Sequence, residues 1–264
     1  MSNAMSDPTT LYARPLGGPT AILEFAGLRL LTDPTFDGPG AYDLGRGYSL
    51  VKTAGPALAP DAIGPIDVVL LSHDHHPDNL DTSGRAFLAR VPRVLTTVSG
   101  AERLGSHATP LPRWAHVDVP QPGGGMLRVT GVPAQHGPDG SDHLTGEVTG
   151  FVLAGEGLPT VYVSGDNASL DVVRAIADRL GQMDVAVLFA GAARTPLLGE
   201  AHLTLSGRTA AEAAQMLGAR RVLPLHVDSW THFSEGVEPL RRAFEDAGIA
   251  DRLVLVELGA TAIL

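Results

Sequence analysis

The chain has 264 residues, enough for one domain with a large buried core or for two small domains. Acidic residues outnumber basic ones by 29 to 19, Lys52 is the only lysine, and the arginines are scattered, so we expect no nucleic-acid partner. Without cysteine there are no disulfides and no thiolate ligands, and no apolar run is long enough to span a membrane.

The first five residues, Met1 to Met5, have the sequence of a cloning scar, and we expect residues 6–264 to form a single domain. No apolar segment of the signal-peptide kind follows them, so we expect a cytoplasmic protein without a membrane partner. Dimers are the commonest oligomers of soluble proteins, so a homo-oligomer stays open.

The apolar pattern predicts a β-rich first part and alternating strands and helices later. In chain order, the expected elements are strands 20–25, 28–31 and 67–72, a helix 80–90, a strand 93–97, a short helix 101–105, strands 115–119, 126–130, 131–134, 148–154 and 160–163, a helix 170–180, a strand 184–189, a helix 207–217, a strand 221–225, a helix 234–247 and a strand 253–258. Ser206 and Ser234 are the expected caps of the last helices. Residues 36–60 are rich in Gly, Pro and Tyr and are expected to form a functional loop. This order predicts an α/β fold of two sheets with helices outside.

The most informative segment is the octet 72–79, Ser-His-Asp-His-His-Pro-Asp-Asn, which directly follows the apolar run 68–71. Three later strands end in His136, Asp166 and His226. Sites in α/β sheets gather at the carboxyl ends of strands, and imidazole with carboxylate suits zinc. The sequence therefore predicts a site for one or two divalent metal ions, zinc first and manganese or iron as alternatives.

These motifs resemble those of the metallo-β-lactamase superfamily, whose signature is His-x-His-x-Asp-His, then a lone His, a lone Asp and a final His. Leu71-Ser72-His73-Asp74 and Asp78-Asn79-Leu80-Asp81 are similar to the branch with ascorbate-6-phosphate lactonase-like and N-acylphosphatidylethanolamine phospholipase-like hydrolases. The resemblance covers nearly all of the chain after residue 5. It implies a four-layer αββα sandwich.

The octet departs from that signature, and two alignments remain open. In one, His73 and His75 are ligands and one residue is inserted before Asp78. In the other, which needs no insertion, Asp74 replaces the first His and Asn79 the last. The residues expected to bind metal are His73, Asp74, His76, Asp78, Asn79, His136, Asp166 and His226.

The resemblance also implies individual roles. Asp78 would bind metal and orient the attacking water, so it is a candidate catalytic residue, and Asp166 would bridge two metals. His202 resembles a histidine that some members use as a general acid or substrate contact. Asp33, in Thr-Asp-Pro, would support the site from behind. His232 either contacts substrate or packs.

We therefore expect a metal-dependent hydrolase that uses a metal-bound hydroxide on an ester, lactone, amide or phosphodiester bond of a small soluble substrate. The alternative is a non-catalytic metal-binding or ligand-binding member of the same fold, because the first motif is degenerate. A di-iron centre with redox chemistry is a third expectation, although such members usually carry a flavin partner domain.

Overall fold

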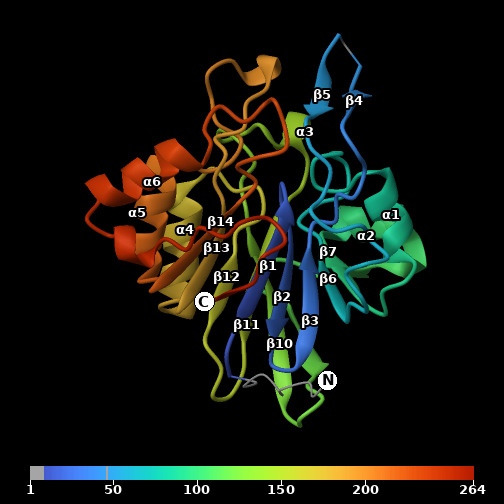
Figure 1. The fold of residues 1–264 in the computed structure, drawn as a ribbon, viewed down its shortest axis with the longest axis vertical. Coiled ribbons are helices and arrows are strands. Elements are labelled where there is room, and N and C mark those ends of the chain that lie inside the picture. Colours follow the sequence, from blue (N-terminus) through green and yellow to red (C-terminus); the bar gives the residue numbers. More distant parts are fainter. Residues whose placement is uncertain (1–8, 46) are drawn as a thin grey trace.

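A computed structural model describes residues 9–45 and 47–264. It forms two facing β-sheets with helices on their outer faces, the expected four-layer α/β sandwich (Figure 1). The predicted cloning scar at Met1 to Met5 lies outside the described residues. No helix in the described ranges is both long and apolar enough to cross a membrane.

The first sheet is antiparallel on one side and parallel on the other. Its strands are, in spatial order, β15 (Ala262–Ile263), β1 (Tyr12–Gly17), β2 (Thr20–Phe25), β3 (Leu28–Thr32), β6 (Val68–Leu70), β7 (Val94–Thr96) and β8 (Thr109–Pro110). The helices α1 (Thr82–Leu88) and α2 (Val98–Leu104) cover its outer face, and the 3₁₀ turn η1 (Gly105–His107) follows α2.

The second sheet has the same mixed character. Its strands are, in spatial order, β14 (Arg221–Leu225), β13 (Val185–Phe189), β12 (Val161–Val163), β11 (Thr149–Ala154), β10 (Met126–Pro133) and β9 (His116–Pro120). The helices α4 (Leu170–Leu180), α5 (Gly207–Leu217) and α6 (Val237–Asp246) cover its outer face (Figure 1). Shorter helices lie in loops: α3 (Asp142–Thr145), η2 (Pro196–Leu198) and η3 (Ala250–Arg252).

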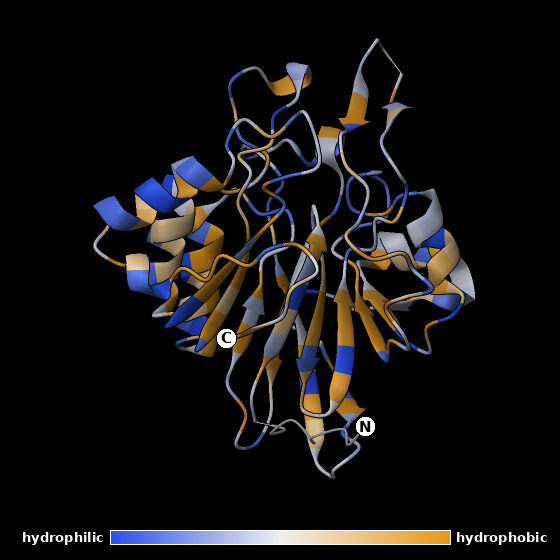
Figure 2. Ribbon diagram, in the orientation of Figure 1, coloured by the Kyte–Doolittle hydropathy of each residue, from blue (hydrophilic) through white to orange (hydrophobic). Residues whose placement is uncertain are grey.

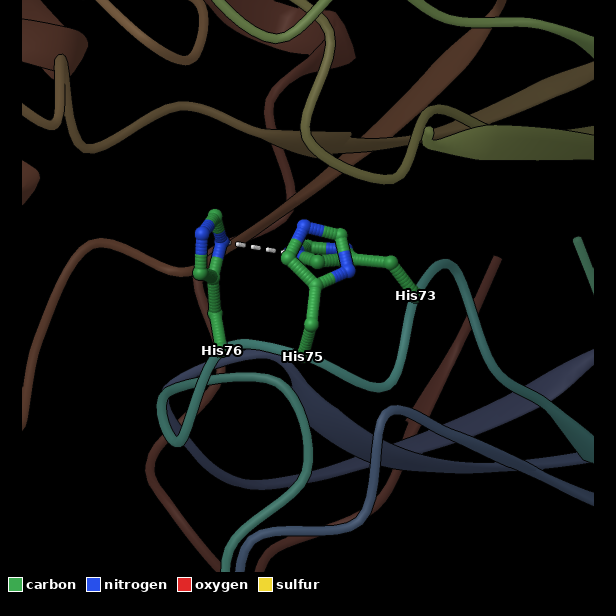
Figure 3. A group of neighbouring side chains, drawn as sticks. All are labelled: His73, His75 and His76. Carbon is green, nitrogen blue, oxygen red and sulfur yellow. Dashed lines mark hydrogen bonds between the residues drawn. The ribbon is translucent and has the colours of Figure 1, made fainter. Parts of the chain in front are cut away.

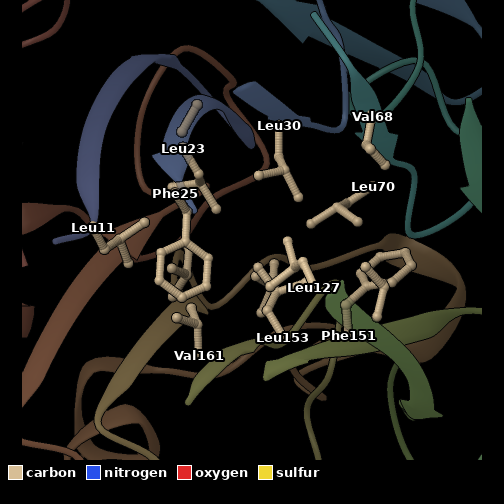
Figure 4. Close-up of a cluster of buried hydrophobic side chains, with 14 of the residues drawn as sticks. Leu11, Leu23, Phe25, Leu30, Val68, Leu70, Leu127, Phe151, Leu153 and Val161 are labelled. Atoms are coloured by element: carbon tan, nitrogen blue, oxygen red, sulfur yellow. The ribbon is translucent and has the colours of Figure 1, made fainter. Parts of the chain in front are cut away.

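Apolar side chains fill the space between the layers. Leu30 and Leu70 of the first sheet meet Leu127, Phe151 and Leu153 of the second in one buried cluster (Figure 4). Separate clusters lie between each sheet and its helices. Because strands such as β13 are buried on both faces, they are continuous apolar runs, and the hydropathy is highest in the middle of the fold (Figure 2).

Local signals predicted several elements correctly. Ser206 caps α5, where its side chain accepts from the Thr209 amide and the Thr209 hydroxyl accepts from the Ser206 amide, a capping box. The strands expected at 148–154 and 160–163 pair as an antiparallel hairpin. The two strands expected at 126–130 and 131–134 are one continuous strand, β10.

Other predictions were wrong at the chain's edges. Residues 253–258 form no strand, because the segment leaves the β14 edge at Val254 and crosses to β1 at Gly259. Gly236, not Ser234, caps α6, since the Ser234 hydroxyl donates to the Ala192 carbonyl. The strand β1 was not predicted, because Pro15 interrupts its pattern.

The segment 36–60 contains a hairpin that the sequence did not predict. Its strands, β4 (Gly40–Asp43) and β5 (Ser49–Lys52), pair with each other and project above the carboxyl ends of the sheets (Figure 1). An isolated bridge also joins Lys52 of β5 to Trp230. Most of their side chains are exposed, so they lack the apolar pattern that identifies a buried strand. The hairpin stands next to the edge where the predicted site residues lie.

Candidate metal centre

The predicted polar residues follow strands that end at one edge of the sandwich. The His-rich octet follows β6, His136 follows β10, Asp166 follows β12 and His226 follows β14. β10, β12 and β14 run in the same direction, because β10 and β12 are both antiparallel to β11 while β12, β13 and β14 are parallel. Their carboxyl ends therefore bring these side chains together.

A close contact between the sheets makes this meeting possible. Gly165, at φ +56°, lies where an added Cβ would come within 2.6 Å of the Thr149 carbonyl and 2.9 Å of the Ser72 Cβ. The Thr149 amide donates to the Ser72 carbonyl at 3.1 Å. A glycine before Asp166 thus lets the β12 end approach the β6 end.

The first group of potential ligands consists of His73, His136 and Asp166, whose donor atoms all lie within 4.8 Å of one another. The Asp166 Oδ2 lies 3.6 Å from the His136 Nε2 and 3.9 Å from the His73 Nε2. The His136 Nδ1–H donates to the Leu203 carbonyl at 2.8 Å. That bond fixes the tautomer and leaves the Nε2 lone pair facing the group, as in a metal-binding histidine.

The second group consists of Asp78, His226 and His232. The Asp78 Oδ2 lies 3.0 Å from the His232 Nε2 and 3.3 Å from the His226 Nε2. The Asp166 Oδ1 lies 3.6 Å from the same His226 nitrogen. Asp166 therefore directs one oxygen to each group, the arrangement of a bridging carboxylate.

Buried polar atoms without hydrogen-bond partners concentrate here. Among the described residues they include the Asp78 Oδ1, the Asp166 Oδ2, both ring nitrogens of His226 and the His232 Nδ1. Each buried polar atom without a partner lowers the stability of the fold by about 1–3 kcal/mol. A concentration of such atoms in one place therefore needs an explanation. Divalent cations take nitrogen and oxygen ligands of these kinds, so the residues present fit a metal site.

The electrostatics favour the ligand states of these groups. Burial lowers the pKa of His136 to about 4 and holds the pKa values of His73 and His76 well below the usual range, so these imidazoles are neutral. Burial raises the pKa of Asp166 to about 7, with the charge of Asp78 acting in the same direction. Burial would also raise the pKa of Asp78, but hydrogen bonds and charges from His226 and His232 hold it well below its usual range. A cation would offset the cost of the Asp166 charge.

The octet takes an arrangement that neither alignment described. The His76 Nδ1 lies 2.9 Å from the His73 Nε2 (Figure 3). The ring centroids of His73 and His76 lie 5.4 Å and 5.2 Å from that of His136, so both rings lie beside the first group. His75 also lies within ligand distance of these two. Its Nε2–H donates to the Thr145 carbonyl at 2.7 Å, and its other ring nitrogen, Nδ1, lies 4.0 Å from the Asp74 carboxylate rather than beside His136 and Asp166. His73 and His76 are thus the best-placed histidines of the turn, and their binding of metal stays a prediction.

Two residues predicted to bind metal lie outside the groups. Asp74 is buried, but its carboxylate points to Arg103, with bonds of 2.5–3.1 Å, and lies 3.7 Å from Arg85. Asn79 donates to the Asp33 Oδ2 at 3.0 Å and to the Asp166 Oδ1 at 3.4 Å. Asn79 therefore stands behind Asp166 and orients it.

Asp33 lies behind the centre, where the resemblance implied it. Its Oδ1 accepts from the Ser72 amide and its Oδ2 from the Ser72 hydroxyl, both at 2.6 Å, besides the bond from Asn79. Its backbone has φ +23°, and His226 has φ +59°, values uncommon for residues other than glycine. Such backbone strain gathers at functional sites.

The structure does not bring His202 to the centre. Its Nε2 accepts from Arg194 at 3.1 Å, and it is not among the described residues that line the cavity above the metal-ligand groups. Its neighbour Leu203 instead supplies the carbonyl that holds His136. His232 was considered only as a substrate contact or packing residue, and its spacing six residues after His226 was the one available signal.

A cavity of about 400 Å³ opens above the two groups. Its floor includes His76, Asp78, His136 and His232, and Tyr48 reaches it from the β4–β5 hairpin. Burial and the charge of Asp78 raise the pKa of Tyr48, so its phenol stays protonated. The volume is in the range of small-molecule sites.

Two facing sheets with outer helices, and histidines and carboxylates gathered at the carboxyl ends of their strands, define the metallo-β-lactamase fold. The chain belongs to this superfamily, because the profile of the family described as Beta-lactamase superfamily domain matches residues 28–227.

Relatives and solved structures agree with this assignment. A UPF0173 metal-dependent hydrolase of Pyrococcus furiosus is 25% identical over 192 residues, which are 69% of this chain and 76% of that protein. One from Methanosphaerula palustris is 28% identical over 209 residues, 75% of this chain and 84% of that protein. The crystal structure of a possible metal-dependent hydrolase from Veillonella parvula is similar with a TM-score of 0.81 and 18% identity, covering 97% of this chain and 100% of that chain.

The crystal structure of isothiocyanate hydrolase from Delia radicum gut bacteria is also similar, with a TM-score of 0.78 and 20% identity. That match covers 95% of this chain and 98% of the other. At these identities the likeness to solved structures establishes the fold alone.

Proposed function

We propose that this protein is a metal-dependent hydrolase of a small soluble substrate, acting on an ester, lactone, amide or phosphodiester bond. The observation that carries the proposal is Asp166, a buried carboxylate whose two oxygens face two separate groups of His and Asp ligands. The net charge of −10 supports a small-molecule substrate over nucleic acid. The relatives described as metal-dependent hydrolases support the same reaction class.

His73, His76, His136 and Asp166 would hold one metal ion, and Asp78, His226, His232 and Asp166 a second. A divalent ion bound there would lower the pKa of water to about 7 and would polarise a carbonyl or phosphoryl oxygen. Zinc suits the imidazole-rich first group, and the carboxylates also admit manganese or iron.

The chain's own residues prepare the site for this chemistry. The Asp78 Oδ1 is buried without a hydrogen-bond partner, so it is free to accept a hydrogen bond from the attacking water and to orient it. Asn79 and Asp33 fix the Asp166 carboxylate from behind. The protonated Tyr48 phenol, at the cavity wall, is available as a donor to the substrate.

The test combines metal content with turnover. We expect metal-replete wild-type protein to hydrolyse generic esters or bis-phosphodiesters, and Asp78→Ala and Asp166→Ala to abolish turnover while keeping the circular-dichroism spectrum. Asp61→Ala is the matched control, since the Asp61 side chain is 82% exposed and pairs only at the surface.

Unchanged turnover in both site variants would refute the proposal. Less than roughly one metal per chain after metal-replete purification, with no turnover, would favour the non-catalytic alternative.

A further inference from the structure

The cavity above the metal centre has apolar walls that come from separate loops. Leu44 at the hairpin tip, Leu144 in α3 and Leu197 in η2 line it although they are 41%, 38% and 51% exposed. Leu50 and Leu203 lie deeper and are buried. A single exposed leucine needs no explanation, but leucines converging from three loops on one opening form a binding surface.

The same walls lack positive charge. No described residue that lines the cavity is Lys or Arg, and Asp78 is the one carboxylate among those residues. Of the nearby cations, Arg103 pairs with Asp74, and the terminal nitrogens of Arg194 contact Glu200 and the His202 Nε2. A negatively charged substituent would therefore lose its hydration without gaining a partner from these walls.

The hairpin that carries part of the wall is anchored at its base. The Lys52 Nζ donates to the buried Asp81 at 2.9 Å, the Thr231 amide donates to the Val51 carbonyl, and the Thr53 amide donates to the Ser229 carbonyl. At the tip, Tyr48 lines the cavity together with Thr195. The cavity is therefore formed before a ligand arrives, which lowers the entropic cost of binding.

We propose that this cavity binds an uncharged, apolar substituent of the substrate, held by Leu44, Leu144 and Leu197 beside the bond that the metal centre cleaves. The inference rests on the proposed hydrolase function and adds the substrate class, molecules that carry a medium-length, uncharged apolar group beside the cleaved bond. Equivalents with a carboxylate or phosphate on that group are poor substrates.

The first experiment compares matched esters with the zinc-loaded protein. The kcat/KM for para-nitrophenyl hexanoate should exceed that for the acetate by about tenfold or more, since each buried methylene contributes about 0.8 kcal/mol. It should also exceed that for mono-para-nitrophenyl adipate, which adds a terminal carboxylate at the same chain length.

Substitutions of the leucines that line the cavity test whether these side chains cause the preference for the hexanoate. Leu144→Ser and Leu197→Ser should lower kcat/KM for the hexanoate by roughly threefold to tenfold more than they lower kcat/KM for the acetate. Leu180→Ser, at an exposed position at the end of α4 and not lining the cavity, is the matched control. Equal losses for acetate and hexanoate, or none, would overturn the proposal.

A binding measurement separates this inference from the hydrolase function. Neutral phenylnaphthylamine should bind more tightly than its sulfonate, anilinonaphthalene sulfonate, and the two leucine variants should weaken its binding. This result supports the apolar cavity even if no ester is hydrolysed, an outcome that would refute only the hydrolase. Preference for the adipate or the sulfonate would overturn the inference.

Discussion

Two buried carboxylates three residues apart, Asp78 and Asp81, have opposite surroundings. The Asp81 Oδ1 accepts from the amides of Phe36 and Gly84, and its Oδ2 accepts from the Asp37 amide and the Lys52 Nζ. Among the described residues, none gives the Asp78 Oδ1 a hydrogen bond, and its Oδ2 lies 3.3 Å from the His226 Nε2 and 3.0 Å from the His232 Nε2.

This difference separates structure from chemistry. Asp81 caps α1 and joins three segments of the chain, so both of its oxygens are occupied by hydrogen bonds that stabilise the fold. Asp78 and Asp166 keep oxygen atoms unpaired, so folding leaves them available to a ligand. A buried carboxylate with every lone pair satisfied is structural, whereas one left unsatisfied is a candidate ligand.

The largest expected effect tests the structural side. Lys52→Met leaves the Asp81 charge buried without its cation, so the free energy of unfolding should fall by about 3–5 kcal/mol in urea denaturation. The control is Arg128→Met, which breaks a solvent-exposed pair with Asp118 and should leave the free energy of unfolding nearly unchanged. An equal loss of unfolding free energy in both variants would contradict the structural role of the Lys52–Asp81 pair.

The second prediction concerns the support behind the ligands. Asp33→Asn places an amide against the Ser72 hydroxyl and the Asn79 amide, so Asp166 loses its fixed orientation. Metal affinity, measured by competition with a chromophoric chelator, should fall by about 10–100-fold. An affinity within twofold of wild type would show that Asp33 serves the fold alone.

The third prediction is a substitution that stabilises the metal-free protein although it removes a candidate metal ligand. Because the folded pKa of Asp166 is raised to about 7, its ionisation destabilises the metal-free fold increasingly from about pH 4, the unfolded pKa, up to pH 7. Asp166→Asn should therefore stabilise the chelator-treated protein by about 1–3 kcal/mol at pH 8, with little gain at pH 4.

Bound metal should abolish that gain in stability, because only the wild-type protein keeps the full set of metal ligands. Thermal unfolding of the wild type and of Asp166→Asn, each with and without zinc, measures the four stabilities to be compared. A variant less stable than wild type in chelator at pH 8 would contradict the interpretation of Asp166 as an unpaired buried charge.

The smallest effect concerns Asp37, a partly buried carboxylate beside Asp81. Burial acts to raise its pKa, but hydrogen bonds from Ser83, Thr82 and Tyr42 outweigh it and lower the pKa. The stability that Asp37 contributes is therefore present above its unfolded pKa of about 3.9 and is lost as the pH falls through the folded value. Asp37→Asn should lower stability slightly at pH 7, and the difference should vanish near pH 2. A constant difference across this range would be inconsistent with ionisation as its cause.

Much of the site could be predicted because its residues follow buried strands. Apolar runs such as 68–71 and 222–225 identify strands by a local pattern, and the polar residue at each end is read directly after the run. His136, Asp166 and His226 were found in this way. The octet was harder, because side-chain direction within a turn depends on packing partners that no local pattern contains.

The sequence by itself determined the fold class and the strand ends that form the centre, because burial on two faces requires continuous apolar runs and polar residues collect where those runs stop. Only the tertiary structure decided which side chains of the octet face inward. Arg103 and Arg85, distant in sequence, draw Asp74 away, while β14 brings His232 in. The tertiary structure also determined the position of the β4–β5 hairpin over the cavity. The hydrogen bonds from Lys52 to Asp81 and from Thr231 to Val51 that hold the hairpin join segments far apart in the chain.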